Sequence, residues 1–339
     1  MSKKVAFAAV DLCISDRAAP GLLFYGGEPL LERGLIKDIV AYADKKSRLQ
    51  YKITTNGTLL DGDFINFAKK SGIAIGFSHD GFAQDDFRVY HDGSGSYKTL
   101  DGIIPLLLES HPYSIGMSVM NPATIHRAAE TVQFLFDKGF RYITQSLNYS
   151  EDAPWTVSHM EILKAEYEKM ADMYIKWTRA EEKFYLSPID LKIISHIKGK
   201  NYAADRIKHT KNQLSVAPDG KIYAVSKFIE NPMFEIGDVF SGISKEKAKT
   251  AFKEIEAVPD LCKRCAIRSR CNYVHDCIII GNGSITRELS PVRCTHEQII
   301  TPIADYVAET LFNEKNAMFV HKHYNRAYPL WSYLEDSSL

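Results

Sequence analysis

The chain has 339 residues, 45% of them hydrophobic, with 42 basic and 42 acidic side chains. This length is enough for one large domain with a smaller one beside it. The balanced charge predicts no nucleic-acid partner, and the longest apolar runs, such as residues 103–108, are too short to span a bilayer. Asp11 interrupts the apolar start and no cleavage site follows, so we expect no signal peptide and a soluble, cytoplasmic protein.

Between residue 22 and about residue 147, short β-like runs alternate with amphipathic helical segments. The predicted strands are 22–27, 51–57, 73–81, 113–121 and 140–148, and helical patterns lie between them at 32–46, 61–72 and 122–139. This alternation predicts a parallel sheet with helices outside it. Gly, Asn, Ser and Asp gather where the strands end, which predicts a ligand site at the carboxyl edge of the sheet.

The second half of the chain has a different character. Residues 156–198 have a helical pattern, and residues 213–225 (QLSVAPDGKIYAV) predict a β-hairpin around Pro218-Asp219-Gly220. A cysteine-rich stretch follows, and the tail from 297 is predicted to be helical with an aromatic end. No low-complexity linker separates the two parts.

Five of the six cysteines lie between residues 262 and 294, whereas Cys13 stands alone on an amphipathic segment and is predicted to be a small buried hydrophobe. In a chain without a secretory signal, such clustering indicates metal binding more than disulfides. Cys262, Cys265 and Cys271 form C-x2-C-x5-C, with Cys277 and Cys294 after them. Four thiolates fit a [4Fe–4S] cluster or tetrahedral zinc, and unligated thiols are the remaining alternative.

Four features together resemble the radical SAM superfamily, in the branch with a C-terminal SPASM domain that includes peptide and sulfatase maturases. They are GGEP at 26–29, TTNG at 54–57, SHDG at 78–81 and the cysteine region. The resemblance covers about residues 5–300. It implies an α/β fold, a partial (β/α)6 TIM-like barrel over residues 1–205 that lacks its first strand. A small SPASM iron–sulfur domain at 206–300 and a C-terminal helix with an aromatic tail at 301–339 would follow.

The resemblance also implies roles for individual residues. In the family, the GGE segment contacts the amino group of the methionine moiety of S-adenosylmethionine (SAM), and an arginine lies near the SAM carboxylate. The cofactor-binding residues implied here are Gly26, Gly27, Glu28, Pro29, Thr55, Asn56, Ser78, Asp80 and Arg88. The implied ligands of one auxiliary [4Fe–4S] cluster are Cys262, Cys265, Cys271 and Cys294. Asn56-Gly57 and Asp80-Gly81 also fit plain turns.

The sequence departs from the family at its redox centres. The 339 residues contain no C-x3-C-x2-C, the motif that holds the SAM-cleaving cluster. Lys208 and Val225 stand where relatives carry two ligands of a second auxiliary cluster, which leaves Cys277 without its partners there. Ser226 stands where the sulfatase-maturing branch has an acidic base. We expect weak SAM binding or none, because one charged pair at a solvent-exposed sheet edge contributes little affinity. We also expect no reductive SAM cleavage by this chain alone.

These observations predict two rival functions. One is a degenerate, non-catalytic protein that binds a peptide or a homologous maturase, with the strand at 22–25 as a sheet edge open to strand addition. The other is an N-terminally truncated form of an active maturase that installs crosslinks in a ribosomal peptide. A third possibility is non-radical chemistry with His79 as the acid–base residue, although a lone histidine at a strand end is more often a hydrogen-bonding residue.

Overall fold

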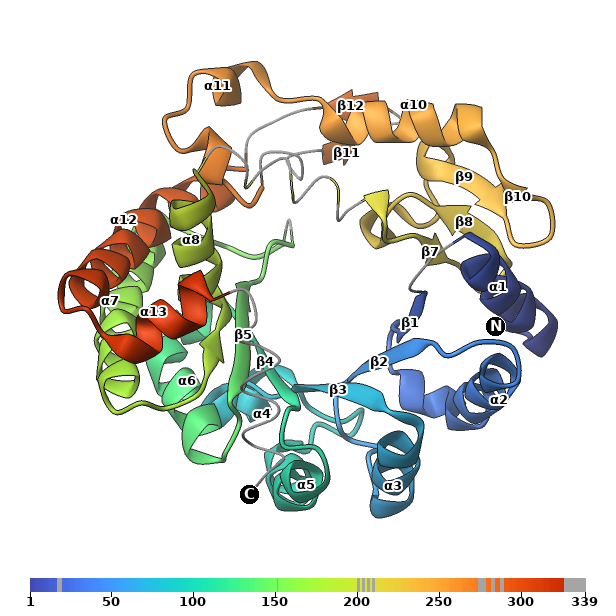
Figure 1. The fold of residues 1–339 in the computed structure, drawn as a ribbon, viewed down its shortest axis with the longest axis horizontal. Helices are drawn as coiled ribbons and strands as arrows, with labels where there is room; N and C mark the ends of the chain where they lie inside the picture. The colour runs from blue at the N-terminus through green and yellow to red at the C-terminus, as the bar shows by residue number, and fades with distance from the viewer. Residues whose placement is uncertain are drawn as a thin grey trace. The chain divides into compact units, whose positions relative to one another are not determined.

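The computed structural model describes residues 1–16, 20–150, 152–199, 202, 205, 208, 211–273, 279–281, 284–286 and 290–325. Its central feature is a parallel sheet of six strands in the order β1-β2-β3-β4-β5-β6, with helices between successive strands (Figure 1). The strands are β1 (Gly21–Phe24), β2 (Gln50–Thr55), β3 (Ile73–Ser78), β4 (Ile115–Met120), β5 (Tyr142–Leu147) and β6 (Tyr185–Leu186). The predicted α/β class and the first five strands are confirmed, and the short β6 is an addition.

The predicted helical segments are present. The helices are α1 (Lys3–Asp16), α2 (Arg33–Asp44), α3 (Gly62–Ser71), α4 (Gln84–Phe87), α5 (Tyr97–Ser110), α6 (Ala128–Asp137), α7 (Val157–Arg179), α8 (Ser187–Lys198), α10 (Lys245–Glu256), α11 (Asp260–Lys263), α12 (Pro291–Asn313) and α13 (Ala317–Tyr324). Of these, α10 and α11 are additions in a region where no helix was predicted. Local chemistry sets the ends of the helices. Asp61 begins α3 by accepting the Phe64 N–H, and Gly72 ends it at φ +66°. No helix in the described ranges is long and apolar enough to cross a membrane.

The chain divides into two compact units. The first comprises Met1–Thr55, Leu59–Ile75 and Lys200–Leu289, and the second Asn56–Thr58, Gly76–Gly199 and Ser290–Leu339. Strand β3 contributes residues to both. In the described part of the chain, β1 is an edge strand of the sheet, paired in parallel with β2 on one side.

The first unit also contains an antiparallel sheet in the order β10-β9-β8-β7. Its strands are β7 (Ser215–Val216), β8 (Lys221–Tyr223), β9 (Glu235–Asp238) and β10 (Gly242–Ile243). The β7–β8 pair is the predicted hairpin, closed by the Gly220 N–H donating to the Ala217 carbonyl at 3.0 Å with Gly220 at φ +97°. A second, two-stranded pair joins β11 (Ile279–Gly281) and β12 (Ser284–Thr286).

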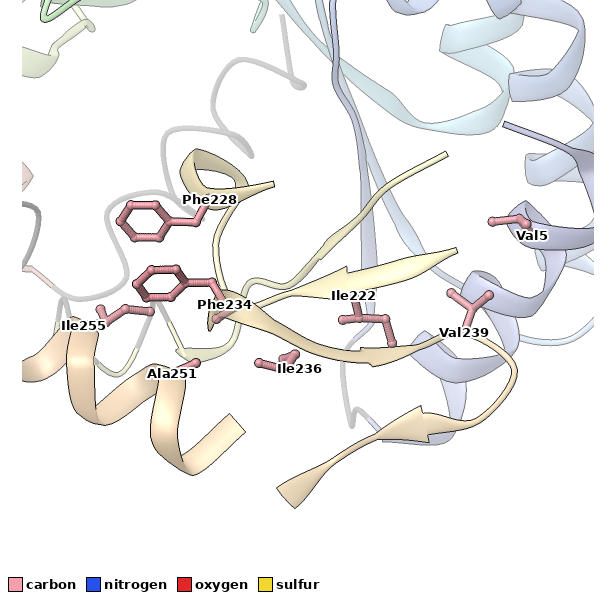
Figure 2. Packing of buried hydrophobic residues seen from close by; sticks show 9 residues of the cluster. Val5, Ile222, Phe228, Phe234, Ile236, Val239, Ala251 and Ile255 are labelled. Carbon is pink, nitrogen blue, oxygen red and sulfur yellow. The ribbon is translucent and has the colours of Figure 1, made fainter. Parts of the chain in front are cut away.

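A hydrophobic core holds this sheet to two helices (Figure 2). Phe228 and Phe234 stack with ring centroids 4.0 Å apart, and Phe234 has no exposed surface. Ile236 of β9 and Ile255 of α10 lie in the same cluster, and Val5 of α1 joins it. Residues near the start of the chain and residues beyond 220 therefore share one core.

The second unit has helices α7, α8, α12 and α13 joined by buried polar contacts. Lys192 of α8 and Glu297 of α12 form an ion pair with essentially no exposed side-chain surface. Asp190 of α8 accepts from the Tyr174 hydroxyl of α7 at 2.7 Å and pairs with Lys322 of α13 at 2.8 Å. Buried charges are tolerated only when paired, and these contacts link α8 to α7, α12 and α13.

Candidate functional site

The GGEP turn follows the end of β1. Gly26 has φ +148°, a conformation that side chains rarely adopt, so the turn requires glycine here. A Cβ added at Gly26 or Gly27 would meet no atom within 4 Å, which means that the backbone borders open space. Pro29 begins a 3-10 turn (Pro29–Glu32) and fixes the direction in which the chain leaves. The turn leaves room for a ligand beside its backbone.

Glu28 is held in one orientation by two donors. Its Oε1 accepts the Leu30 N–H at 3.0 Å and the Thr55 hydroxyl at 2.7 Å. Thr55 ends β2 and is 1% exposed. The structure thus brings together two residues that the motifs name separately. A carboxylate with a fixed orientation is suited to accept a cationic group such as an ammonium.

Asn56 stabilises a turn, which was the alternative to a role in ligand binding. Its Oδ1 accepts both the Thr58 N–H at 3.0 Å and the Thr58 hydroxyl at 2.8 Å, and Gly57 follows at φ +79°. These bonds form an Asx turn that reverses the chain after β2. The side-chain carbonyl of Asn56 is therefore used within its own loop.

Asp80 and Arg88 form an ion pair beyond the end of β3. Arg88 Nε donates to Asp80 Oδ2 at 2.6 Å, and Asp80 Oδ1 accepts the Val119 N–H at 2.9 Å. The Asp80 side chain is 7% exposed and that of Arg88 27%. Ser78, two residues before Asp80, ends β3 and is half-buried. The predicted residues Ser78, Asp80 and Arg88 thus include an oriented guanidinium near the edge of the sheet.

His79 lies apart from these groups. Its ring is completely buried, stacks on Phe134 at 5.1 Å and contacts the edge of Tyr97 at 5.5 Å, both on helices. Its Nδ1 accepts the Gly81 N–H at 2.9 Å, and burial lowers its pKa to about 4. His79 directly follows β3 and its ring packs against α5 and α6, whereas Asp80 accepts a hydrogen bond from β4. The interpretation of His79 as a pocket acid–base residue is wrong.

The cysteines are distributed over several local turns. Cys262 lies on α11, the Cys265 N–H donates to the Cys262 carbonyl at 3.1 Å, and Cys271 follows a 3-10 turn. The Tyr273 N–H donates to Cys271 Sγ at 3.3 Å, the kind of bond that stabilises a thiolate ligand. Cys294 belongs to the first turn of α12, in the second unit.

No three Cys, His, Asp or Glu side chains gather at metal-binding distance among the described residues. The donor set has the right chemistry for iron–sulfur or zinc, and its assembly stays a prediction. Cys277 lies outside the described residues. Lys208 is exposed, and Val225 precedes a 3-10 turn that starts at Ser226.

Two residues that the motifs did not indicate support the Arg88 segment. Gln84 and Ser96 are 1% and 2% exposed and hydrogen-bond to each other at 2.8 Å. Nothing in their sequence context distinguishes them from ordinary loop residues. Only the return of the chain after α4 places them together.

Gly-Gly-Glu, Thr-Asn-Gly and Ser-x-Asp-Gly turns follow three parallel strands, at the carboxyl ends where α/β proteins usually bind their ligands. Residues 1–135 match the family model described as Radical SAM superfamily. The match identifies residues 1–135 as similar to a radical SAM domain.

Curated relatives match parts of the chain, and two of them are anaerobic sulfatase-maturating enzymes. An uncharacterized protein of Methanocaldococcus jannaschii is 32% identical over 152 residues, 43% of this chain and 53% of that protein. A cysteine-type anaerobic sulfatase-maturating enzyme of Clostridium novyi is 29% identical over 128 residues, 35% of this chain. The chain thus spans about half and about a third (34%) of these two proteins. A serine-type enzyme of Bacteroides thetaiotaomicron is 21% identical over 315 residues, covering 80% of this chain and 73% of that protein.

Solved structures share the fold. Native anSMEcpe with bound AdoMet and Kp18Cys peptide superimposes with a TM-score of 0.72 at 15% identity, over 92% of this chain and 91% of that one. Streptococcus suis SuiB bound to S-adenosylmethionine gives a TM-score of 0.57 at 13% identity, over 80% and 64% of the two chains. The partial-barrel prediction is thereby confirmed as a fold.

Proposed function

We propose that this protein is a degenerate peptide maturase of the radical SAM/SPASM type. It binds SAM weakly, carries one auxiliary [4Fe–4S] cluster and holds a peptide or a maturase partner, without cleaving SAM by its own residues. The observation that carries the proposal is the oriented Glu28 carboxylate beside the open Gly26-Gly27 turn. In the family, the electron for SAM cleavage comes from a separate cluster held by C-x3-C-x2-C; this chain supplies the groups that hold SAM.

The residue roles follow from chemistry on each strand end. Glu28 accepts the ammonium of SAM, held for that purpose by the Leu30 N–H and the Thr55 hydroxyl. Arg88 presents its guanidinium to a carboxylate. Such polar contacts in a solvent-exposed site add little affinity, so SAM binding in the millimolar range is expected.

The loss of redox chemistry rests on internal positions. Lys208 and Val225 carry no thiol, and a lysine ammonium or an aliphatic side chain is no ligand for iron–sulfur clusters. Ser226 lacks the acidity of a carboxylate and cannot act as the proton acceptor expected there. Peptide binding is proposed because relatives of this fold include one with a bound peptide. A homologous maturase is the second partner class.

A test measures cofactor content and SAM chemistry on one preparation. The protein is purified without oxygen, and iron, acid-labile sulfide and zinc are determined per chain. About four irons and four sulfides, lost in Cys271→Ala and retained in Cys13→Ala, support one cluster. Zinc without iron would show that the cysteines form a structural zinc site. About eight irons per chain would contradict the loss of the other clusters.

The second candidate function is an active maturase whose SAM-cleaving cluster is bound by residues outside these 339. The overlap with anSMEcpe over 92% of this chain favours it. Dithionite-reduced protein is incubated with SAM, and release of methionine is measured. If no methionine is released and SAM binding is lost in Glu28→Gln, the proposal of a degenerate protein is supported. Turnover by the chain alone overturns it.

A further inference from the structure

We propose that Asp80, Gln84 and Ser96 are positioning residues that hold the Arg88 guanidinium ready for a carboxylate, and that Asp80 itself does not touch the ligand. We name these three residues the Arg88 brace. The inference rests on the proposed SAM site, because SAM supplies the carboxylate. In this proposal Asp80 does not line the pocket but holds Arg88, which does.

Asp80 has both carboxylate oxygens occupied. Oδ1 accepts the Val119 N–H of β4 at 2.9 Å, and Oδ2 accepts Arg88 Nε at 2.6 Å. Its own N–H donates to Gln84 Oε1 at 2.8 Å. A buried carboxylate with these partners is fixed by strand β4, and a negatively charged ligand group would be repelled by it. Direct contact with the carboxylate of SAM is therefore excluded for Asp80.

The terminal nitrogens of the Arg88 guanidinium are available to a ligand. Only Nε of its guanidinium is hydrogen-bonded within the described residues, and the side chain is 27% exposed. A guanidinium offers five N–H donors in a planar fork, and the terminal pair matches the two oxygens of a carboxylate. Asp80 holds Nε of Arg88, so the terminal nitrogens of the guanidinium point in one direction. The side chain therefore loses little conformational entropy when it binds a carboxylate.

The backbone of Arg88 is fixed by the other two members of the brace. The Ser96 hydroxyl donates to the Arg88 carbonyl at 2.6 Å, and Gln84 Nε2 donates to Ser96 Oγ at 2.8 Å. The loop that brings Ser96 back passes Gly95, where a Cβ would overlap the Asp85 carboxylate. All three brace side chains are at most 5% exposed by residue, so water does not compete for these bonds.

The test compares two ligands that differ by one carboxylate. SAM and decarboxylated SAM are titrated into the full chain at millimolar concentration by calorimetry. The variants are Arg88→Lys, which retains the charge but loses the fork, Asp80→Asn and Gln84→Met. Asp86→Asn is the matched control, because it removes an exposed carboxylate from the same helix, α4. Thermal melts of each variant show whether it folds.

The expected result is an affinity for SAM about 10-fold lower in Arg88→Lys and Asp80→Asn, with the affinity for decarboxylated SAM changed by less than about twofold. Gln84→Met also lowers the affinity for SAM, and Asp86→Asn changes the affinity for neither ligand. If both ligands weaken equally, or SAM binding is unchanged, the brace is overturned while the SAM site stands. If the unmodified chain binds neither ligand, both proposals fail.

Discussion

Replacement of His79 by Asn should make the protein less sensitive to acid. His79 is completely buried among aromatic rings, and burial lowers its pKa from 6.5 to about 4. Asp80 and Asp101 raise that pKa and Arg88 and Lys138 lower it, all by less than burial does. As the pH falls, the unfolded chain binds the proton before the folded one, so His79 destabilises the fold below about pH 6.5.

The magnitude follows from the two pKa values. A shift from 6.5 to about 4 corresponds to about 3 kcal/mol in total, and about 2 kcal/mol of it is lost between pH 7 and pH 5. His79→Asn removes this loss and retains an oxygen acceptor for the Gly81 N–H. It also leaves a gap beside Phe134, which should cost about 2 kcal/mol at either pH.

Urea unfolding followed by circular dichroism at pH 7 and pH 5 measures this difference. The unmodified protein loses additional stability from His296 and His323, whose pKa values burial lowers to about 3 and about 4. The comparison between variant and unmodified protein isolates His79. His126→Leu, at an exposed position, is the control. A variant that loses as much stability as the unmodified protein between the two pH values would refute the assignment.

Three further changes test the packing. Phe234→Ala should cost about 4 kcal/mol of unfolding free energy, because a fully buried ring is removed; a cost below about 1 kcal/mol would contradict the core. Gly57→Ala should destabilise by more than about 2 kcal/mol, since its Cβ would overlap the Phe77 ring at φ +79°, whereas Gly102→Ala, with open space around it, should not; equal melting temperatures would contradict this. Lys322→Ala should cost about 3 kcal/mol and speed hydrogen exchange in α13, and unchanged exchange there would show that the pairing does not hold the helix.

The fold was predictable where the sequence pattern repeats. Five strands and the hairpin at Pro218-Asp219-Gly220 stand out because apolar runs are bounded by turn residues. The two residues of β6 carry no such signal. The segment after Pro122 was predicted as one helix, but it begins as a 3-10 turn (Pro122–Arg127) before α6. Periodicity does not distinguish the two at a helix start.

The site was predictable only in part, because motifs name residues but not their directions. Glu28 and Thr55 were named separately, and the structure joins them through one hydrogen bond. His79 and Asp80 are adjacent in sequence, yet His79 packs against Phe134 of α6 and Asp80 accepts a hydrogen bond from Val119 of β4. Gln84 and Ser96 acquire their roles only through the return of the chain after α4.

The proposed loss of redox centres and the retained pocket geometry have different physical causes. A cluster loses its binding site when its thiol ligands are replaced by side chains that do not bind iron. Glu28 and Asp80, by contrast, each hold local backbone in place, Glu28 at the Pro29–Glu32 turn and Asp80 at Val119 of β4. Removing either would leave a backbone N–H without its acceptor. Their persistence is therefore explained by folding alone. Selective loss of SAM binding in Arg88→Lys would show that ligand binding is maintained as well, because no backbone N–H depends on the Arg88 side chain.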